Sequence, residues 1–201
     1  RFGVDQRAAL RAKASGEEIP DLLVMTATPI PRTAAMTVYG DLDVSVLDEL
    51  PPGRTPISTK WVEGEDEVWE KIRNQVKQGN QAYVVCPLIG DNETTQKASV
   101  ENTHKRLVED ELGDLKVDLL HGRLTGPEKQ EVMARFRDGN TDVLISTTVI
   151  EVGVDVPNAT VMAILDAERF GIAQLHQLRG RVGRGDMESC CFLVSGVRTD
   201  E

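Results

Sequence analysis

Val143-Leu144-Ile145-Ser146-Thr147-Thr148 is the stretch that decides the fold, because a short apolar run passes directly into two hydroxyl side chains. In parallel α/β sheets, buried strands are followed by polar loops, and the chemistry lies beyond the carboxyl ends of the strands. Hydroxyls and backbone N–H groups in such a loop can hold a phosphate without adding net charge. This stretch therefore predicts a buried strand that leads into a candidate site.

On both sides of this run the hydrophobic pattern alternates between strand and helix. Strands are expected at residues 57–62, 82–87, 117–120, 143–146, 161–165 and 190–194, and helices at 65–78, 98–112, 127–137 and 172–181. The alternation predicts an α/β fold with a mainly parallel sheet and helices on both faces. The linker-like run Pro51-Pro52-Gly53-Arg54-Thr55-Pro56 divides the chain into residues 1–54 and 55–201.

Composition excludes some classes of protein. The 201 residues are 40% hydrophobic and 28% charged, with a net charge of −10, which argues against a protein that coats polyanions non-specifically. Any contact with nucleic acid must be local. The apolar runs are far shorter than the roughly 20 residues of a membrane span, so no membrane partner is expected. Cys86, Cys190 and Cys191 lack the spacing of a zinc site or a disulfide framework, which favours reduced thiols in a cytoplasmic protein and no metal site.

Gln177-Leu178-Arg179-Gly180-Arg181-Val182-Gly183-Arg184 sets arginines among glycines without an acid. Guanidinium forks match phosphate oxygens, and glycines remove side chains that block close approach. An arginine brought to a γ-phosphate from a neighbouring domain accelerates phosphoryl transfer on the order of 10³–10⁵. Taken alone, this octet is equally compatible with a basic surface turn.

Three other segments have similar alternatives. Gly153 lets the backbone approach a ligand and Asp155 can accept a hydrogen bond from a ribose, while the valines around them can simply pack a connection. The stretch His121-Gly122-Arg123 follows a strand and is either a phosphate contact or a common turn. Thr26-Ala27-Thr28 also follows an apolar run, and is either a relay of hydroxyls or a capped turn.

The order of these segments carries more information than any one of them. Residues 26–28, 83–87, 147–157 and 177–184 occur in the succession of motifs III, IV, V and VI of superfamily 2 helicases, which the chain resembles. The likeness narrows at residues 25–54 and at Leu120-His121-Gly122-Arg123-Leu124, which are similar to the RecG family of bacterial branched-DNA helicases. The transcription-repair coupling factor and the primosomal helicase share parts of this pattern.

The resemblance implies a RecA-like fold of the P-loop NTPase type. Residues 1–54 would end the first RecA-like domain, and residues 55–201 would form most of the second. ATP and Mg²⁺ would bind between the two domains, mainly on the missing upstream part. Arg181 and Arg184 would act as arginine fingers oriented by Gln177, with Gly153 and Asp155 near the nucleotide.

The same resemblance assigns the remaining residues. DNA would be contacted by His121, Gly122, Arg123, Thr147, Thr148 and Glu151, while Thr26 and Thr28 would couple nucleotide state to domain closure. The activity implied is ATP-dependent remodelling of replication forks and Holliday junctions by branch migration, in recombination and repair of DNA damage. A bacterial, nucleoid-associated location and a single-stranded-DNA-binding protein as a further partner are expected.

The 201 residues contain no Gly-x-x-x-x-Gly-Lys-[Ser/Thr] loop. We therefore expect that the chain does not hydrolyse ATP alone. In the family that it resembles, the magnesium-binding carboxylates immediately precede an Arg-Phe-Gly like Arg1-Phe2-Gly3, so the resemblance implies a fragment that starts just after them. The apolar run at 22–25 would lack its sheet, so residues 1–50 are expected to be disordered, to dock on the second domain, or to exchange with another copy. The rival interpretation is a non-catalytic nucleic-acid-binding or regulatory module that lost its nucleotide site.

Overall fold

The structure is a computed structural model that describes residues 45, 56–87, 93–147 and 156–196, with the backbone alone for 93–99. From residue 56 onward these belong to one of two units of the chain, residues 43–201. The other unit, residues 1–42, lies outside the described part. The boundary expected between residues 54 and 55 falls at the edge of the described ranges and stays a prediction.

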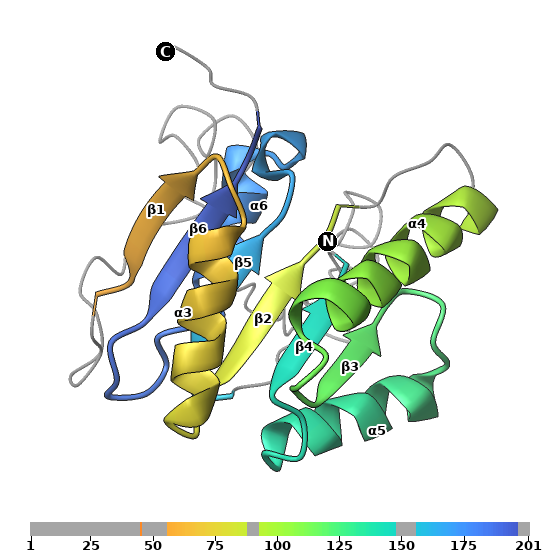
Figure 1. The fold of residues 1–201 in the computed structure, drawn as a ribbon, viewed down its shortest axis with the longest axis horizontal. Coiled ribbons are helices and arrows are strands. Elements are labelled where there is room, and N and C mark those ends of the chain that lie inside the picture. Colours follow the sequence, from red (N-terminus) through yellow and green to blue (C-terminus); the bar gives the residue numbers. More distant parts are fainter. Residues whose placement is uncertain (1–44, 46–55, 88–92, 148–155, 197–201) are drawn as a thin grey trace, which may run out of the picture. The chain divides into compact units, whose positions relative to one another are not determined.

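Six strands form one sheet in which every neighbouring pair is parallel. In chain order they are β1 (Ser58–Val62), β2 (Gln81–Val85), β3 (Val117–Leu120), β4 (Val143–Ser146), β5 (Ala159–Ile164) and β6 (Cys190–Val194). Their order across the sheet is β1-β6-β5-β2-β4-β3 (Figure 1). All six expected strands are present and the parallel α/β fold is confirmed.

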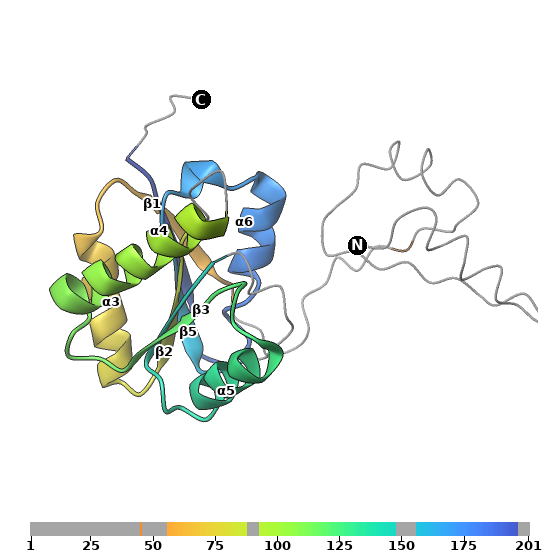
Figure 2. The ribbon, with the colours of Figure 1, turned by 90° about the vertical axis from the view of Figure 1, so that its right-hand side faces the viewer.

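Helices cover both faces of the sheet. The long ones are α3 (Asp66–Lys77), α4 (Glu93–Arg106), α5 (Gly126–Arg137) and α6 (Ile172–Arg179), with a π-helical turn at Leu107–Glu111 and a 3₁₀ turn at Ala167–Arg169. Viewed along the sheet, α3 and α4 lie on one side and α5 and α6 on the other (Figure 2). This arrangement follows from right-handed crossovers that first advance towards β3 and then return towards β6.

Alternation along the strands builds two cores. In β2, Ala82 and Val84 join the cluster under α3, while Tyr83 and Val85 join the cluster under α5 and α6. The Tyr83 and Phe136 rings meet edge to face with centroids 4.9 Å apart. Both faces of the central strands are therefore dry, as the continuous apolar runs predict.

Two helices differ from the sequence-based expectation by more than one residue at an end. The helix expected at 98–112 begins at Glu93 and ends in the π-helical turn, where the Leu112 N–H bonds to the Leu107 carbonyl at 2.7 Å. That wider turn lets both leucines bury completely. The helix expected at 172–181 ends at Arg179, because Gly180 is a poor helix former and the next turn tightens through Arg181 N–H to the Leu178 carbonyl. Arg181 thus lies outside the helix.

Candidate functional site at the strand ends and after helix α6

The carboxyl ends of four strands meet at one edge of the sheet. The Cys86 N–H bonds to the Ser146 carbonyl at 2.8 Å, Thr147 N–H to Leu120 at 3.3 Å, and Leu165 N–H to Val85 at 2.9 Å. The loops that follow β3, β4, β2 and β5 therefore start side by side. As expected, His121 and Thr147 begin loops of this edge.

The same edge contains a topological switch point. Strand β2 lies between β4 and β5, yet the chain leaves β2 towards α4 on one face and leaves β5 towards α6 on the other. In open parallel sheets, ligands bind in the crevice where neighbouring connections diverge in this way. Cys86, Thr147 and Asp166 stand at the ends of the strands around it.

The loop His121-Gly122-Arg123, which we call the β3–α5 loop, is held by the start of α5. Thr125 and Glu128 form a reciprocal capping box, in which the Glu128 carboxylate accepts the Thr125 N–H and hydroxyl at 2.7 Å each. These hydrogen bonds lower the pKa of Glu128, with a smaller contribution from His121. The capping box fixes where the loop ends and the helix begins.

Within this loop, the Arg123 N–H donates to His121 Nδ1 at 3.3 Å and Lys129 Nζ donates to the Gly122 carbonyl at 2.7 Å. The His121 Nδ1 acts as the acceptor, so a neutral ring carries its proton on Nε2. Gly122 and Arg123 are exposed. The loop thus presents donors to solvent, which suits a phosphate backbone.

Thr147 is fully buried, and its hydroxyl is one of two buried side-chain polar atoms in the described ranges without a hydrogen-bond partner. A buried unsatisfied hydroxyl costs about 1–3 kcal/mol. Such a cost at the end of a central strand indicates a group kept for something other than stability.

The turn after α6 presents the arginines. Gln177 lies half-buried in the last turn of α6, Arg181 is half-buried and Arg184 is exposed. The Arg184 Nε contacts the Gly180 carbonyl at 3.4 Å, near the limit for a hydrogen bond. The turn therefore carries the guanidinium groups of Arg181 and Arg184 three residues apart in the sequence. Guanidinium groups of this kind can bind an anionic polyphosphate.

Glycines fix this turn against the rest of the domain. Gly183 has φ +72°, and a Cβ there would lie 2.7 Å from Ile57 Cγ1, while a Cβ on Gly185 would lie 2.9 Å from the Pro157 carbonyl. The sequence-based interpretation assigned Gly183 to ligand approach. Gly183 is instead buried, and it makes room for Ile57. Close packing of Gly183 and Gly185 against Ile57 and Pro157 thus fixes the conformation of the turn.

The candidate residues fall into two groups at opposite ends of the strands. The turn at 181–185 packs on Ile57, Pro157 and Ser189, which precede β1, β5 and β6. The β3–α5 loop and Thr147 follow the carboxyl ends of β3 and β4 instead. The loops that begin at His121 and Thr147 lie at the carboxyl edge, where candidates after strands are expected, whereas the arginine turn lies at the other end of the strands.

Six expected site residues lie outside the described ranges: Thr26, Thr28, Thr148, Glu151, Gly153 and Asp155. Their roles stay predictions.

Sequence reasoning missed Asp166. It follows β5 at the switch point and is the one non-glycine residue in the described ranges with a positive φ, +47°. Burial raises the pKa of Cys86, and the negative charge of Asp166 raises it further. Strained residues of this kind concentrate at functional sites. The available signal was a carboxylate directly after a buried strand.

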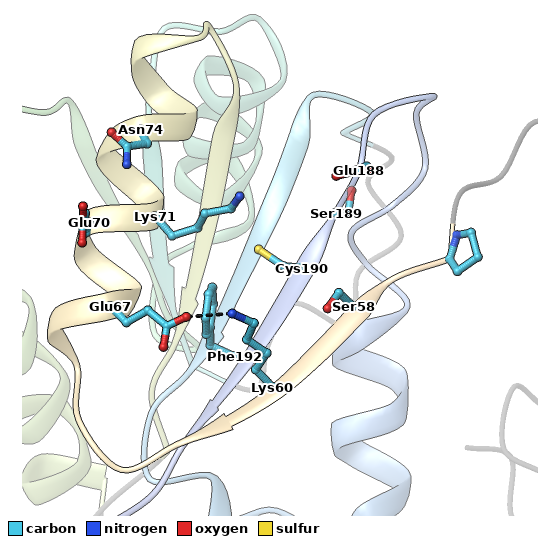
Figure 3. A pocket seen from close by; sticks show the side chains of 11 residues that line it. Ser58, Lys60, Glu67, Glu70, Lys71, Asn74, Glu188, Ser189, Cys190 and Phe192 are labelled. Atoms are coloured by element: carbon cyan, nitrogen blue, oxygen red, sulfur yellow. Dashed lines mark hydrogen bonds and ion pairs between the residues drawn. The ribbon is translucent and has the colours of Figure 1, made fainter.

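A hollow of about 480 Å³ lies elsewhere, over the first residues of β1 and β6 beside α3 (Figure 3). Lys60 crosses it to Glu67 at 2.8 Å, and this hydrogen bond raises the pKa of Lys60. Lys71 and Cys190 also line it, and no predicted site residue does. The mixed charges of the lining give no single ligand class, so the strand-end and arginine groups remain the candidate site.

The described residues offer neither a metal cluster nor a membrane-spanning helix. They contain no group of three His, Cys, Asp or Glu side chains that could hold a metal ion. None of their helices combines the length and the apolar character that crossing a membrane requires.

Comparison with known proteins agrees with the motif order. The helicase conserved C-terminal domain matches residues 66–186. The chain belongs to this helicase family. It is 53% identical to the ATP-dependent DNA helicase RecG of Mycobacterium bovis and 48% identical to that of Bacillus subtilis, over its whole length. It spans 29% of the length of each of these relatives.

Solved structures give the same result for the helicase domain. A RecG bound to a three-way DNA junction matches with TM-score 0.74 and 51% identity, over 91% of this chain and 24% of that one. The L327V variant of yeast Dbp5 bound to RNA and ADP BeF3 matches with TM-score 0.56 at 16% identity, covering 86% of this chain and 44% of that one, which shows the fold alone. The RecA-like fold and the resemblance to RecG are confirmed.

Proposed function

We propose that this chain is part of an ATP-dependent double-stranded-DNA translocase or helicase of the RecG type. The observation that carries the proposal is the separation of two phosphate-directed groups, the arginine turn after α6 and the β3–α5 loop with Thr147, at opposite ends of one rigid sheet. A motor needs such a separation, because nucleotide and DNA must bind the same domain at different places. The parent protein would remodel forks and Holliday junctions in recombination and repair.

The arginine turn would serve ATP. Arg181 and Arg184 would stabilise charge on the γ-phosphate, and Gln177 in the preceding helical turn would orient them. Gly153 and Asp155 would lie near the nucleotide, and Thr26 and Thr28 would couple its state to domain closure. Mg²⁺ and the β- and γ-phosphates would be held by the partner RecA-like domain, because the 201 residues contain no phosphate-binding loop.

The carboxyl-end group would serve DNA. The exposed Arg123 suits phosphate oxygens, and His121 lies beside it in the same loop. Thr148 and Glu151 would complete this DNA surface. The Thr147 side chain is fully buried in this structure, so it would support the surface from the end of β4 rather than contact phosphate. Contacts of this kind position the protein without reading sequence, as expected for an enzyme that recognises branches. A single-stranded-DNA-binding protein, self-association through residues 1–54 and a cytoplasmic, nucleoid-associated location complete the proposal.

The test is ATP hydrolysis by the full native protein, with and without forked DNA, comparing wild type with Arg184→Ala. We expect forked DNA to stimulate hydrolysis and the substitution to lower kcat on the order of 10³ while nucleotide still binds. Arg137→Ala is the matched control, because Arg137 is an exposed arginine on α5 whose side chain bonds to its neighbour Asp138 at 3.4 Å.

The alternative is a nucleic-acid-binding or regulatory module without catalysis. A native protein that binds forked DNA and never hydrolyses ATP would overturn the motor and favour the module. Hydrolysis that survives Arg184→Ala unchanged would keep the motor and remove Arg184 from its chemistry.

A further inference from the structure

We propose that Lys129 is a positioning residue for DNA binding, because its ammonium holds the Gly122 carbonyl and so fixes the β3–α5 loop in the conformation that presents Arg123. This inference rests on the proposed DNA role of that loop. Lys129 belongs to none of the motifs recognised in the sequence.

The central contact spans seven residues. Lys129 lies in the first turns of α5, and its Nζ reaches back to the Gly122 carbonyl at 2.7 Å, the short distance typical of a charge-assisted hydrogen bond. The Lys129 backbone is itself fixed, since its N–H bonds to the Thr125 carbonyl at 3.0 Å. The side chain therefore ties the middle of the loop to a rigid helix.

The hydrogen bond from Lys129 restrains a glycine, the residue type with the greatest backbone freedom. Gly122 is exposed and has no Cβ, so it has the widest choice of backbone conformations in the loop. The Arg123 N–H bond to His121 and the Leu124 N–H bond to the His121 carbonyl, each 3.3 Å, run within the loop. Lys129 adds a bond to the scaffold, which lowers the entropy that DNA binding must otherwise remove.

Local charge also favours this role over a simple ion pair. The neighbouring Glu128 carboxylate is occupied by the N–H and hydroxyl of Thr125 in the capping box. Lys129 donates to a carbonyl rather than to that carboxylate. Its ammonium therefore stays next to the Gly122–Arg123 peptide, within the loop proposed to meet phosphate.

The experiment measures the affinity of the full native protein for forked DNA, by fluorescence anisotropy at several salt concentrations. The variants are Lys129→Met, Lys129→Arg, Arg123→Ala and the double variant K129M/R123A. Lys77→Met is the matched control, an exposed lysine in the last turn of α3 on the opposite face of the sheet. Melting temperatures of all variants verify that each one folds.

We expect Lys129→Met to weaken binding about 3–10-fold, Lys129→Arg to restore most of the affinity, and Lys77→Met to change little. In the Arg123→Ala background, Lys129→Met should cost less than about twofold, because Lys129 acts through the loop. Additive losses, with the salt slope lowered by about one for each residue, would overturn positioning in favour of a direct phosphate contact. An unchanged affinity for Lys129→Met would overturn the inference outright.

Failure of the proposed function is visible separately. If wild type neither binds forked DNA nor hydrolyses ATP, the DNA role of the whole loop fails, and the inference fails with it. If wild type does both and only the Lys129 series is flat, the motor stands and Lys129 has no part in it.

Discussion

At Gly183, backbone geometry and packing require the same residue. Its φ of +72° lies in the left-handed region, and any side chain would meet Ile57 Cγ1 at 2.7 Å. Arg184 follows directly, so the direction of its side chain depends on this one position. A single methyl group added at Gly183 would therefore disturb the conformation of the arginine turn.

We predict that Gly183→Ala lowers the free energy of unfolding by about 1–3 kcal/mol, from strain at positive φ plus the clash. Urea unfolding of the native protein measures this. Gly64→Ala is the control, because a Cβ at Gly64 would meet no atom within 4 Å and no positive φ constrains that residue. Equal stability of the two variants would contradict the prediction.

The three cysteines have raised pKa values because burial disfavours the thiolate. The pKa reaches about 12 for Cys86 and Cys191 and is raised for Cys190. Since the thiolate is the nucleophile, we predict that these three cysteines label slowly with iodoacetamide at pH 8 in the native protein and rapidly once it is unfolded. Fast labelling of Cys86 in the folded protein would show that the end of β2 is open.

At the scale of elements, Asp118 joins β3, α5 and the segment before β4. Its carboxylate accepts Arg135 Nη2 at 2.8 Å and Nε at 3.1 Å, as well as the Thr141 hydroxyl. The hydrogen bonds from Arg135, followed by that from Thr141, lower the pKa of Asp118 against a partial desolvation. This carboxylate fastens α5, and with it the β3–α5 loop, to the sheet.

The sign of the pH effect follows from that shift. A carboxylate whose pKa is lower in the folded state stabilises the protein above its ordinary pKa, and the stabilisation is lost as pH falls through the folded value. We predict that Asp118→Asn costs about 1–3 kcal/mol at pH 7 and makes stability less dependent on pH below about 4. Urea unfolding between pH 3 and 7, with Asp138→Asn as an exposed control, tests this. A variant that keeps the wild-type acid slope would contradict it.

At the scale of the whole domain, the central strands of the sheet are buried, whereas β1 at its edge is exposed to solvent. Every residue of β2, β4 and β5 is buried, whereas four of the five residues of β1 are exposed and Trp61 retains 47% of its surface. Local opening should follow this gradient, because backbone protection depends on buried apolar contacts.

We predict that amide hydrogen exchange is slowest in β2 and β5 and fastest, among the strands, in β1. Hydrogen exchange with mass spectrometry on the native protein measures it. Protection of β1 equal to that of β2 would mean that another part of the native protein covers this edge, since a bare edge exposes its outward N–H groups.

The sequence by itself determined the fold class, the six strands and the order of the motifs, because buried parallel strands are written as continuous apolar runs that polar loops punctuate. It also pointed to Arg181, Arg184 and the β3–α5 loop as candidate phosphate contacts, since such contacts need local charge and glycine. Only the tertiary structure decided that these groups lie at opposite ends of the strands, that Gly183 serves packing, and that Asp166 and Lys129 lie beside the candidate groups. Those facts depend on which strands become neighbours and on which distant residues a side chain contacts. The spacing of residues along the sequence determines neither.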